Sequence, residues 1–158
     1  MEWNYEYDVV VVGSGNGALT AALCSHDGGA KTLVIEKSSQ FGGTSATSGG
    51  GVWIPNNRYA KAENIDDSDQ DARNYINSVS PEGMIKDDLI ETYISEGPRM
   101  IDYLHENSQV KYRNLPHYPD YFPDNTGGKE GNRSMEPEPI FGTELGDDLG
   151  KLREQHPQ

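Results

Sequence analysis

A short apolar strand that leads directly into a glycine-rich turn limits the folds open to this chain more than any other feature. Residues 8–12 read Asp-Val-Val-Val-Val, and such a continuous apolar run is typical of a parallel strand buried on both faces. A glycine-rich turn at 13–17 and a helix-favouring run at 18–24 follow, and residues 32–35 supply a second apolar strand. Strand, tight turn, helix and strand in this order predict a βαβ unit with a right-handed crossover.

The turn has the spacing expected of a dinucleotide site. In Gly13-x-Gly15-x-x-Ala18, the first glycine permits the tight turn and the second lets a pyrophosphate approach the backbone N–H groups at the helix start. The alanine lets helix and strand pack closely. Glu36 ends the second strand, where a carboxylate accepts hydrogen bonds from a ribose diol. This combination predicts dinucleotide binding, and the alternative is a purely structural glycine turn followed by a solvated acid.

A second loop of small residues indicates which dinucleotide is bound. Residues 42–51 read Gly-Gly-Thr-Ser-Ala-Thr-Ser-Gly-Gly-Gly and lead into the apolar sequence Val52-Trp53-Ile54-Pro55. A domain that binds only a nicotinamide dinucleotide has no evident need for this loop so soon after the expected ribose-binding acid, so the loop argues against such a domain. The alternative, a flexible Gly/Ser linker, is disfavoured because the apolar sequence after the loop indicates an anchored segment.

Charge and cysteine content exclude several other functions. The chain has 13 Lys and Arg against 26 Asp and Glu, a formal charge of −13, which repels phosphate backbones and excludes nucleic acid as an expected partner. No apolar run approaches the roughly 20 residues that cross a bilayer. Cys24 is the only cysteine and the four histidines lack metal-ligand spacing, so we expect no metal site. Residues 1–6 lack the features of a signal peptide, which favours a cytoplasmic location.

The rest of the chain divides into a helical and a loop-rich part. Helical periodicity begins after residues 66–68, which read Asp-Asp-Ser and offer a cap, and it returns over 89–107. Gly97-Pro98 is expected to break or kink the second helix. Residues 115–158 contain six of the nine prolines, and we expect them to form loops that are disordered unless they dock on another part of the structure.

The glycine-rich segments resemble a flavoprotein family that includes 3-ketosteroid dehydrogenases and the flavoprotein subunits of fumarate reductase and succinate dehydrogenase. The residues that carry this resemblance are 8–15, 36–37, 42–46 and 48–55. Within the family the chain is most similar to the 3-ketosteroid dehydrogenases, through residues 43–46, 53–55, 118–123, 131–134 and 136–137. The resemblance implies an α/β fold: a Rossmann-like FAD/NAD(P)-binding domain, incomplete in this chain, with a helical and loop extension.

The resemblance also implies FAD as the cofactor. It assigns the first glycine loop to the pyrophosphate, residues 42–46 to the adenosine-side phosphate and the ribitol, and the Ser-Gly-Gly segment to the vicinity of the isoalloxazine. The residues expected to bind the cofactor are Gly13, Ser14, Gly15, Asn16, Gly17, Ala18, Glu36, Lys37, Gly42, Gly43, Thr44, Ser45, Ser48, Gly49 and Gly50.

The activity implied by the resemblance is the removal of two hydrogens from adjacent carbons beside a ketone, as in a 3-ketosteroid. A base removes the proton next to the carbonyl, and the neighbouring carbon transfers a hydride to flavin N5. Tyr121 matches a tyrosine that hydrogen-bonds the proton-abstracting tyrosine, and a phenol with an unperturbed pKa of about 10 needs such donors. Alternatively, Tyr121 only packs in a Pro-rich loop. Arg133 either orients a carboxylate or a loop, or forms a salt bridge with a nearby acid.

The enzymes of this family are several times longer than this chain. We therefore expect residues 1–114 to be the N-terminal part of an FAD-binding domain, and residues 115–158 to be a Pro/Gly-rich active-site loop and linker toward an absent substrate domain. The expected partners are a small-molecule substrate, a steroid, and the missing C-terminal segments or a second chain that completes the fold. Alone, the chain is expected to be inactive. Two alternatives stay open: a non-catalytic dinucleotide-binding module, and a fragment of a fumarate reductase-type flavoenzyme.

Overall fold

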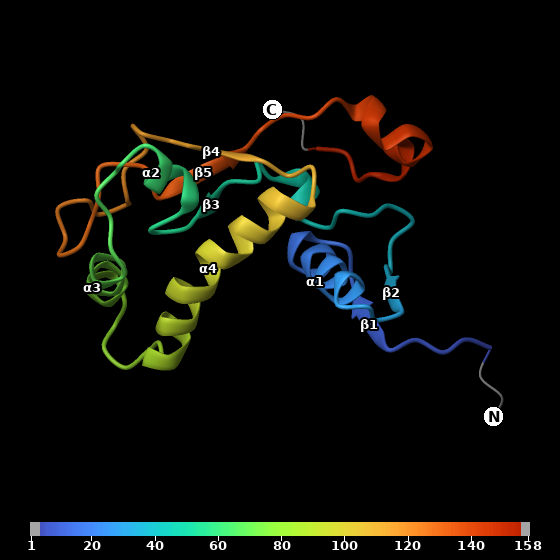
Figure 1. Ribbon diagram of the computed structural model, residues 1–158, viewed down its shortest axis with the longest axis horizontal. Helices are drawn as coiled ribbons and strands as arrows, with labels where there is room; N and C mark the ends of the chain where they lie inside the picture. Colours follow the sequence, from blue (N-terminus) through green and yellow to red (C-terminus); the bar gives the residue numbers. More distant parts are fainter. Residues whose placement is uncertain (1–3, 156–158) are drawn as a thin grey trace. The chain divides into compact units, whose positions relative to one another are not determined.

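The computed structural model describes residues 4–155, which belong to two compact units (Figure 1). Among the described residues, the first unit combines 4–50 with 140–155, and the second consists of residues 51–139. The expected boundary between residues 114 and 115 thus falls inside the second unit. None of the helices within residues 4–155 combines the length and the apolar composition needed to cross a membrane.

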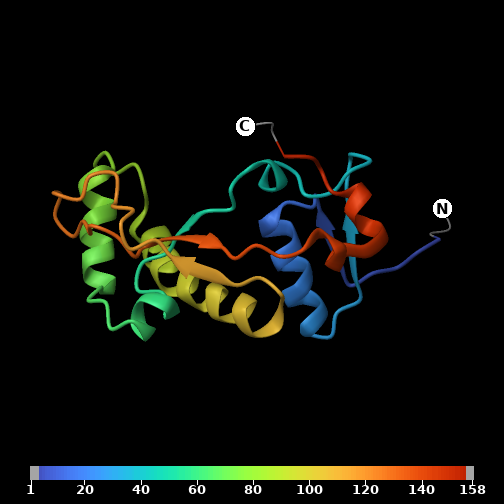
Figure 2. The same ribbon diagram turned by 90° about the horizontal axis from the view of Figure 1, so that it is seen from above.

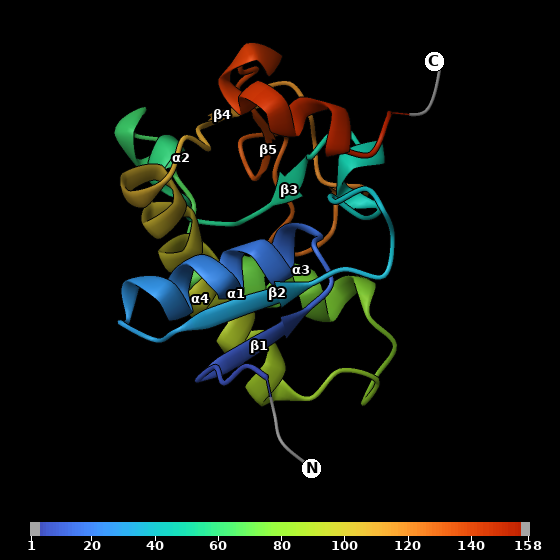
Figure 3. The same cartoon turned by 90° about the vertical axis from the view of Figure 1, so that its right-hand side faces the viewer.

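The first unit is built on a βαβ unit. Strand β1 (Val9–Val12), helix α1 (Asn16–Asp27) and strand β2 (Thr32–Ile35) follow one another along the chain. The two strands pair in parallel, from Val9 opposite Thr32 to Val12 opposite Ile35. Helix α1 packs against both strands on one face of this two-stranded sheet (Figure 3). The predicted βαβ unit is confirmed.

One face of the β1–β2 sheet is exposed. Val10 and Val12 are 52% and 78% exposed, and Ile35 is 44% exposed. The prediction that the first strand is buried on both faces is therefore wrong for the described part of the chain. The apolar run indicates that the strand is suited to burial on both faces. It does not indicate which other element covers the second face.

Two further segments complete the first unit. The small-residue loop after β2 contains the short 3-10 helix η1 (Ser45–Thr47), and the C-terminal segment contains the 3-10 helix η2 (Gly142–Lys151). The C-terminal segment returns to the loop, because Phe41 pairs with Leu152 in an isolated parallel bridge. The Arg153 N–H also donates to the Phe41 carbonyl oxygen at 2.9 Å. Residues 152–153 are therefore bonded to the start of the loop that follows β2.

The second unit is an antiparallel sheet packed on a long helix. Its strands are β3 (Val52–Trp53), β4 (Tyr112–Asn114) and β5 (Ser134–Pro137), in the order β3–β5–β4, and its helices are α2 (Arg58–Ala62), α3 (Asp69–Val79) and α4 (Asp87–Asn107). Its main core joins Ile54, Ile101 of α4, Tyr112 of β4 and Met135 of β5. The strands β4 and β5 thus lie along α4 (Figure 2).

Helix α3 begins where the sequence predicted a cap. The Ser68 hydroxyl accepts a hydrogen bond from the Asp71 N–H at 3.0 Å, so Ser68 is the N-cap among residues 66–68. The cap satisfies one of the N–H groups that the first turn of a helix leaves without a partner. The prediction of a cap at these residues is confirmed.

Helix α4 continues through Pro98, so a break, one of the two outcomes predicted for Gly97-Pro98 beside a kink, is not observed. A proline inside a helix costs about 3 kcal/mol. Fully burying one large aliphatic side chain contributes roughly 1.5–3 kcal/mol, and α4 buries several, including Ile90, Ile94 and Ile101. Packing therefore outweighs the local preference. Gly97 is itself buried, and a Cβ atom added there would lie 3.3 Å from the Ile54 Cδ1 atom.

The loop-rich segment after β4 is anchored in the second unit. Its two ends meet, because the Leu115 N–H donates to the Ser134 carbonyl oxygen at 3.0 Å and the Asn132 N–H donates to the Leu115 carbonyl oxygen at 3.1 Å. Asp120 and Arg133 are 4% and 1% exposed. The loop-rich segment needs few apolar residues, because its hydrogen bonds and buried polar side chains anchor it to neighbouring elements.

Candidate functional site

The first glycine loop leaves the N-terminus of α1 without a side-chain cap. Gly13 has a φ of 96°, which is in the left-handed region that favours glycine. Its N–H donates to the Ile35 carbonyl oxygen at 2.7 Å, which ties the turn to the end of β2. Gly15 is the N-cap residue and has no side chain to bond the N–H groups of the first helical turn. These N–H groups, together with the helix dipole, favour an anionic ligand.

The second small-residue loop packs against the first. A Cβ atom added at Gly43 would lie 3.5 Å from the Gly15 Cα atom. The Ser45 hydroxyl oxygen accepts a hydrogen bond from the Asn16 N–H at 3.0 Å. Gly42 has a φ of 108°, and a Cβ atom there would lie 2.6 Å from the Ala46 Cβ atom. The positive φ and the short Cβ distance therefore require glycine at position 42.

Open space remains beside the first loop. Cβ atoms added at Gly13 and Gly17 would meet no atom within 4 Å. The absent side chains thus leave a cradle next to the uncapped helix terminus, as the pyrophosphate of a dinucleotide requires. These residues fit FAD, because backbone donors, open space and the Glu36 carboxylate occur in one place.

Ser14 connects the two loops to the acid at the end of β2. Its hydroxyl donates to the Glu36 Oε2 atom at 2.5 Å and accepts a hydrogen bond from the Gly42 N–H at 3.0 Å. The Ser14 side chain is therefore held by protein partners, and the residue is only 3% exposed.

Glu36 is prepared as a hydrogen-bond acceptor. Besides the Ser14 hydroxyl, the Ser38 N–H donates to the Glu36 Oε1 atom at 2.9 Å. The hydrogen bond from Ser14, followed by that from the Ser38 backbone, lowers the pKa of the Glu36 carboxyl below its usual value. The carboxylate is thus ionised near neutral pH and presents only acceptor atoms.

The other predicted cofactor residues lie in the first turn of α1, after β2 and along the second loop. Ala18 is half-buried in the first turn of α1, Thr44 is exposed just before η1, and Lys37 is exposed next to Glu36. Further along the second loop, the Ser48 hydroxyl donates to the Ser45 carbonyl oxygen at 3.1 Å and accepts from the Gly50 N–H at 3.0 Å; Gly49 lies between them and is exposed. The second loop is thus a hydrogen-bonded structure rather than a flexible linker.

Tyr121 lies in the loop between β4 and β5 of the second unit. Its side chain is 85% exposed, and that of the following Phe122 is 59% exposed. Within the described residues, Tyr121 therefore does not pack into a core, which was the alternative to a functional role. Its phenol is available to a ligand or to another part of a larger protein.

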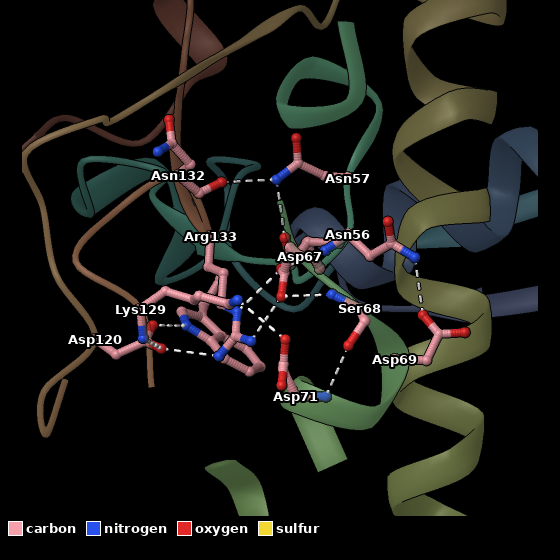
Figure 4. Close-up of polar contacts among 12 residues, drawn as sticks. Asn56, Asn57, Asp67, Ser68, Asp69, Asp71, Asp120, Lys129, Asn132 and Arg133 are labelled. Atoms are coloured by element: carbon pink, nitrogen blue, oxygen red, sulfur yellow. Dashed lines mark hydrogen bonds and ion pairs between the residues drawn. The ribbon is translucent and has the colours of Figure 1, made fainter. Parts of the chain in front are cut away.

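Asp120, the residue before Tyr121 in the sequence, belongs to a buried ion cluster with Arg133 and Asp67 (Figure 4). Arg133 Nη2 and Nε donate to the two carboxylate oxygens of Asp67 at 2.7 and 3.0 Å, and Nη1 donates to Asp120 Oδ2 at 2.9 Å. The guanidinium carbon lies 5.5 Å from the centre of the Trp53 ring and 5.8 Å from that of Tyr75. Burial opposes the charged form, but the two aspartates outweigh it and raise the pKa of Arg133. Arg133 thus stays charged in the interior.

Local sequence indicates a role for Arg133 but does not identify the partners of its side chain. Asp67 lies 66 positions away, in an acidic run that is typical of a helix cap or a solvated face. Asp120 lies 13 positions before Arg133 in the same loop-rich segment, and this shared segment is the one signal that connected them. The salt bridge with a nearby acid, which was one of the two expectations for Arg133, is observed twice.

Comparison with known proteins places both units in one family. A family model described as an FAD binding domain matches residues 8–157. A 3-oxosteroid 1-dehydrogenase from Mycolicibacterium smegmatis is 42% identical over 147 residues, which are 93% of this chain and 26% of that protein. A 4-oxocyclohexanecarboxylate 2-dehydrogenase from Sinomonas cyclohexanicum is 40% identical over 132 residues, which are 84% of this chain and 23% of that protein.

A solved structure agrees with these relatives. The crystal structure of a 3-ketosteroid Δ1-dehydrogenase from Sterolibacterium denitrificans, in complex with 1,4-androstadiene-3,17-dione, matches with a TM-score of 0.89 and 42% identity. The match covers 95% of this chain and 26% of that one. This chain therefore spans about a quarter of the length of the relatives that it matches. The resemblance to 3-ketosteroid dehydrogenases and the expectation of FAD are confirmed, and the chain belongs to the FAD binding domain family.

Proposed function

We propose that this chain is the FAD-binding, N-terminal portion of an oxidoreductase that dehydrogenates a CH–CH bond next to a ketone. The observation that carries the proposal is the cradle at the uncapped start of α1, where Ser14 joins two glycine loops and Glu36. The 42% identity to a 3-oxosteroid 1-dehydrogenase supports a 3-ketosteroid as the substrate.

The residues of the cradle have separate tasks in binding FAD. The backbone N–H groups in the first turn of α1 bind the pyrophosphate, because the N-cap Gly15 has no side chain to bond them and they lie beside open space. The Gly13 and Asn16 N–H groups already donate to the Ile35 carbonyl oxygen and the Ser45 hydroxyl oxygen, so they shape the loop instead. The Glu36 carboxylate accepts hydrogen bonds from the ribose hydroxyls. Lys37 and residues 42–50 bind the remainder of the cofactor. Bound FAD supplies a two-electron acceptor for the substrate.

Tyr121 contributes to the proton-transfer half of the reaction. The ketone acidifies the adjacent carbon, and a second tyrosine, outside this chain, takes the proton. The exposed Tyr121 hydroxyl hydrogen-bonds that second phenol and stabilises its ionised form. Tyr121 therefore assists the base and does not itself remove the proton.

A smaller cyclic ketone is the second candidate substrate. The relative from Sinomonas cyclohexanicum is named for an oxocyclohexanecarboxylate, and its 40% identity nearly equals that of the steroid enzyme. The reaction class is the same for both candidates. Direct comparison of a 3-ketosteroid with 4-oxocyclohexanecarboxylate as substrates distinguishes them.

The full activity requires more protein than these residues. The exposed apolar face of the β1–β2 sheet supports completion of the fold by C-terminal segments or by a second chain. In this proposal residues 1–114 belong to the FAD-binding domain, and residues 115–158 supply the active-site loop and the link to a substrate domain. A cytoplasmic location is also part of the proposal, and it is supported by the free, exposed thiol of Cys24.

A chimeric enzyme tests the proposed reaction. The matching segment of the Mycolicibacterium smegmatis relative is replaced by this chain, and turnover of a 3-ketosteroid is measured with an artificial electron acceptor. We expect the chimera to bind FAD and to form the dehydrogenated ketone, and the isolated chain to show no turnover. A folded, FAD-loaded chimera without turnover of either candidate ketone would contradict the proposed activity. Turnover by the isolated chain would contradict the proposal that it is incomplete.

A further inference from the structure

Both chain neighbours of Tyr121 are held in place, although Tyr121 itself is exposed. On one side, the Asp120 side chain is 2% exposed and its carboxylate accepts three hydrogen bonds. The Trp53 Nε1–H donates to Oδ1 at 2.6 Å, while Arg133 Nη1 and the Lys129 N–H donate to Oδ2 at 2.9 and 3.0 Å. The Asp120 N–H also donates to the Lys129 carbonyl oxygen at 2.9 Å.

On the other side, the loop after Tyr121 is folded tightly. The Phe122 N–H donates to the Tyr75 hydroxyl of α3 at 3.3 Å. The Asn125 N–H donates to the Phe122 carbonyl oxygen at 3.0 Å. A Cβ atom added at Gly127 would lie 2.2 Å from the Asp71 carbonyl oxygen, and one at Gly128 would lie 2.3 Å from that of Pro123. The backbone on this side of Tyr121 therefore has little room to move.

The buried arginine links these anchors to the rest of the second unit. Arg133 holds Asp120 with one arm of its guanidinium group, and with the other it holds Asp67, just before α3. Figure 4 shows the arginine between the two aspartates, with Lys129 beside Asp120. Without Arg133, the Asp120 carboxylate would be left in the interior with no cation bonded to it. Its position would then no longer be determined by a charged partner.

We propose that Arg133 is a positioning residue for Tyr121, acting through Asp120. Arg133 and the Trp53 indole fix the Asp120 carboxylate, and this carboxylate fixes the backbone from which the Tyr121 phenol extends into solvent. The inference rests on the proposed function of Tyr121 for its catalytic meaning. An exposed phenol on a free loop would occupy many orientations, whereas a held backbone limits them before a substrate or a base arrives.

The test uses the two arms of Arg133 as matched variants of this chain. Tyrosines are labelled with 3-fluorotyrosine, and the Tyr121 signal is assigned by its loss in Tyr121→Phe. Asp120→Asn removes the charge on the arm that leads to Tyr121, and Asp67→Asn removes the charge on the other arm. We expect Asp120→Asn to shift the Tyr121 fluorine signal and to speed amide exchange at residues 121–126 at least tenfold. Asp67→Asn is expected to leave the Tyr121 signal in place.

Two further variants keep the test decisive. Trp53→Phe removes one donor to Asp120 and retains an aromatic ring, so it serves if Asp120→Asn does not fold; it is expected to shift the same signal less. Arg133→Met removes the charge and is expected to shift the Tyr121 fluorine signal. Arg133→Lys retains the charge and is expected to shift it less. An unchanged Tyr121 signal in folded Asp120→Asn and Trp53→Phe chains would overturn the inference. Equal shifts in Asp120→Asn and Asp67→Asn would also overturn it, because the cluster would then act as a general stabiliser.

A separate readout distinguishes the inference from the proposed function. In the chimeric enzyme, Tyr121→Phe and Asp120→Asn are expected to lower kcat for the 3-ketosteroid more than they raise KM. If Tyr121→Phe leaves turnover unchanged while Asp120→Asn still shifts the Tyr121 signal and speeds amide exchange, the proposed catalytic role of Tyr121 fails. The proposed positioning role of Arg133 then stands. If Tyr121→Phe lowers turnover while Asp120→Asn leaves the Tyr121 fluorine signal unchanged, only the proposed positioning role of Arg133 fails.

Discussion

Ser14 determines how the acid at the end of β2 meets the two glycine loops. One hydroxyl group donates to Glu36 and accepts from the Gly42 N–H, so a single oxygen joins the first glycine loop, the end of β2 and the start of the second loop. Serine suits this position because a hydroxyl group is donor and acceptor at once. Alanine would fill the same buried space but would make neither bond.

Replacement of this hydroxyl should be visible in the titration of Glu36. In Ser14→Ala, the main cause of the lowered Glu36 pKa is removed, so we expect the pKa to rise toward the usual value for glutamate. Carbon-detected NMR titration of the Glu36 side chain measures it. Ser45→Ala, which leaves the Ser14–Glu36 bond intact, is the control. A Glu36 pKa unchanged by Ser14→Ala would show that this bond does not form in solution.

The same bond predicts how stability depends on pH. Because the Glu36 pKa is lower in the folded chain than in the unfolded one, the bond contributes stability above the unfolded pKa. This contribution is lost as the pH falls through the folded pKa. The difference in unfolding free energy between the wild-type chain and Ser14→Ala should therefore be constant near neutral pH and shrink in acid. A difference that grows in acid would contradict this sign.

Residues of the cradle were predictable because their neighbours are close in sequence or follow a fixed motif. The βαβ order places Glu36 beside the first glycine loop whatever the rest of the chain does. The partners of Arg133 were not predictable in this way. Asp67, Trp53 and Asp120 reach it only after three separate segments of the second unit have packed together.

At the scale of elements, the start of α3 links a helix cap to the buried ion cluster. Ser68 caps the helix through the Asp71 N–H, and the Ser68 N–H donates to the Asp67 Oδ1 atom at 2.9 Å. The residue that starts α3 thus also orients an aspartate that binds Arg133. Local sequence predicted the cap, whereas tertiary packing added the second role.

Removal of this cap should destabilise the chain measurably. Ser68→Ala removes the acceptor of the Asp71 N–H, and loss of such a cap typically costs about 1 kcal/mol. We expect that decrease in the free energy of unfolding, measured by urea denaturation. Ser80→Ala, at the other end of α3, is the control and should cost less. Equal losses in the two variants would contradict a specific capping role for Ser68.

Elements were predicted best where local preference and packing agree. Strands β1 and β2 and helix α1 follow from apolar runs separated by glycine turns. Helix α4 differs, because the local preference of Gly97-Pro98 for a break is opposed by the buried residues on both sides. Local sequence contains the preference but not the packing energy that opposes it.

At the scale of the whole molecule, burial is uneven between the two units. The second unit has clusters of fully buried apolar residues around Ile101 and Ala72, whereas α1 of the first unit has no buried residue. The apolar run of β1 predicted a strand suited to burial, and the described residues cover only one of its faces. No local sequence pattern of this chain specifies which residues would cover the other face of β1.

The exposed strand face should make the isolated chain self-associate. Val12 is 78% exposed in an apolar strand, so we expect concentration-dependent association in analytical ultracentrifugation. Val12→Lys should reduce this association while changing the unfolding free energy by only about 0.5 kcal/mol, since surface substitutions rarely change it more. Asn4→Lys, outside the sheet, is the control for added charge. Association that is unaffected by Val12→Lys would show that this face is not the cause.

The central claim is that these residues form an FAD cradle at the start of α1, and equilibrium titration of the isolated chain with FAD tests it most directly. The wild-type chain and Gly150→Asp should bind one FAD. Gly15→Asp adds the same charge at the N-cap, where aspartate is a favoured cap and where a Cβ atom fits 3.4 Å from the Ser45 Oγ atom. Gly15→Asp should keep or raise the unfolding midpoint but weaken FAD binding at least tenfold. The added carboxylate accepts hydrogen bonds from the N–H groups of the first helical turn and repels the pyrophosphate. A wild-type chain that binds no FAD, or a folded Gly15→Asp chain that binds it equally well, would contradict the claim.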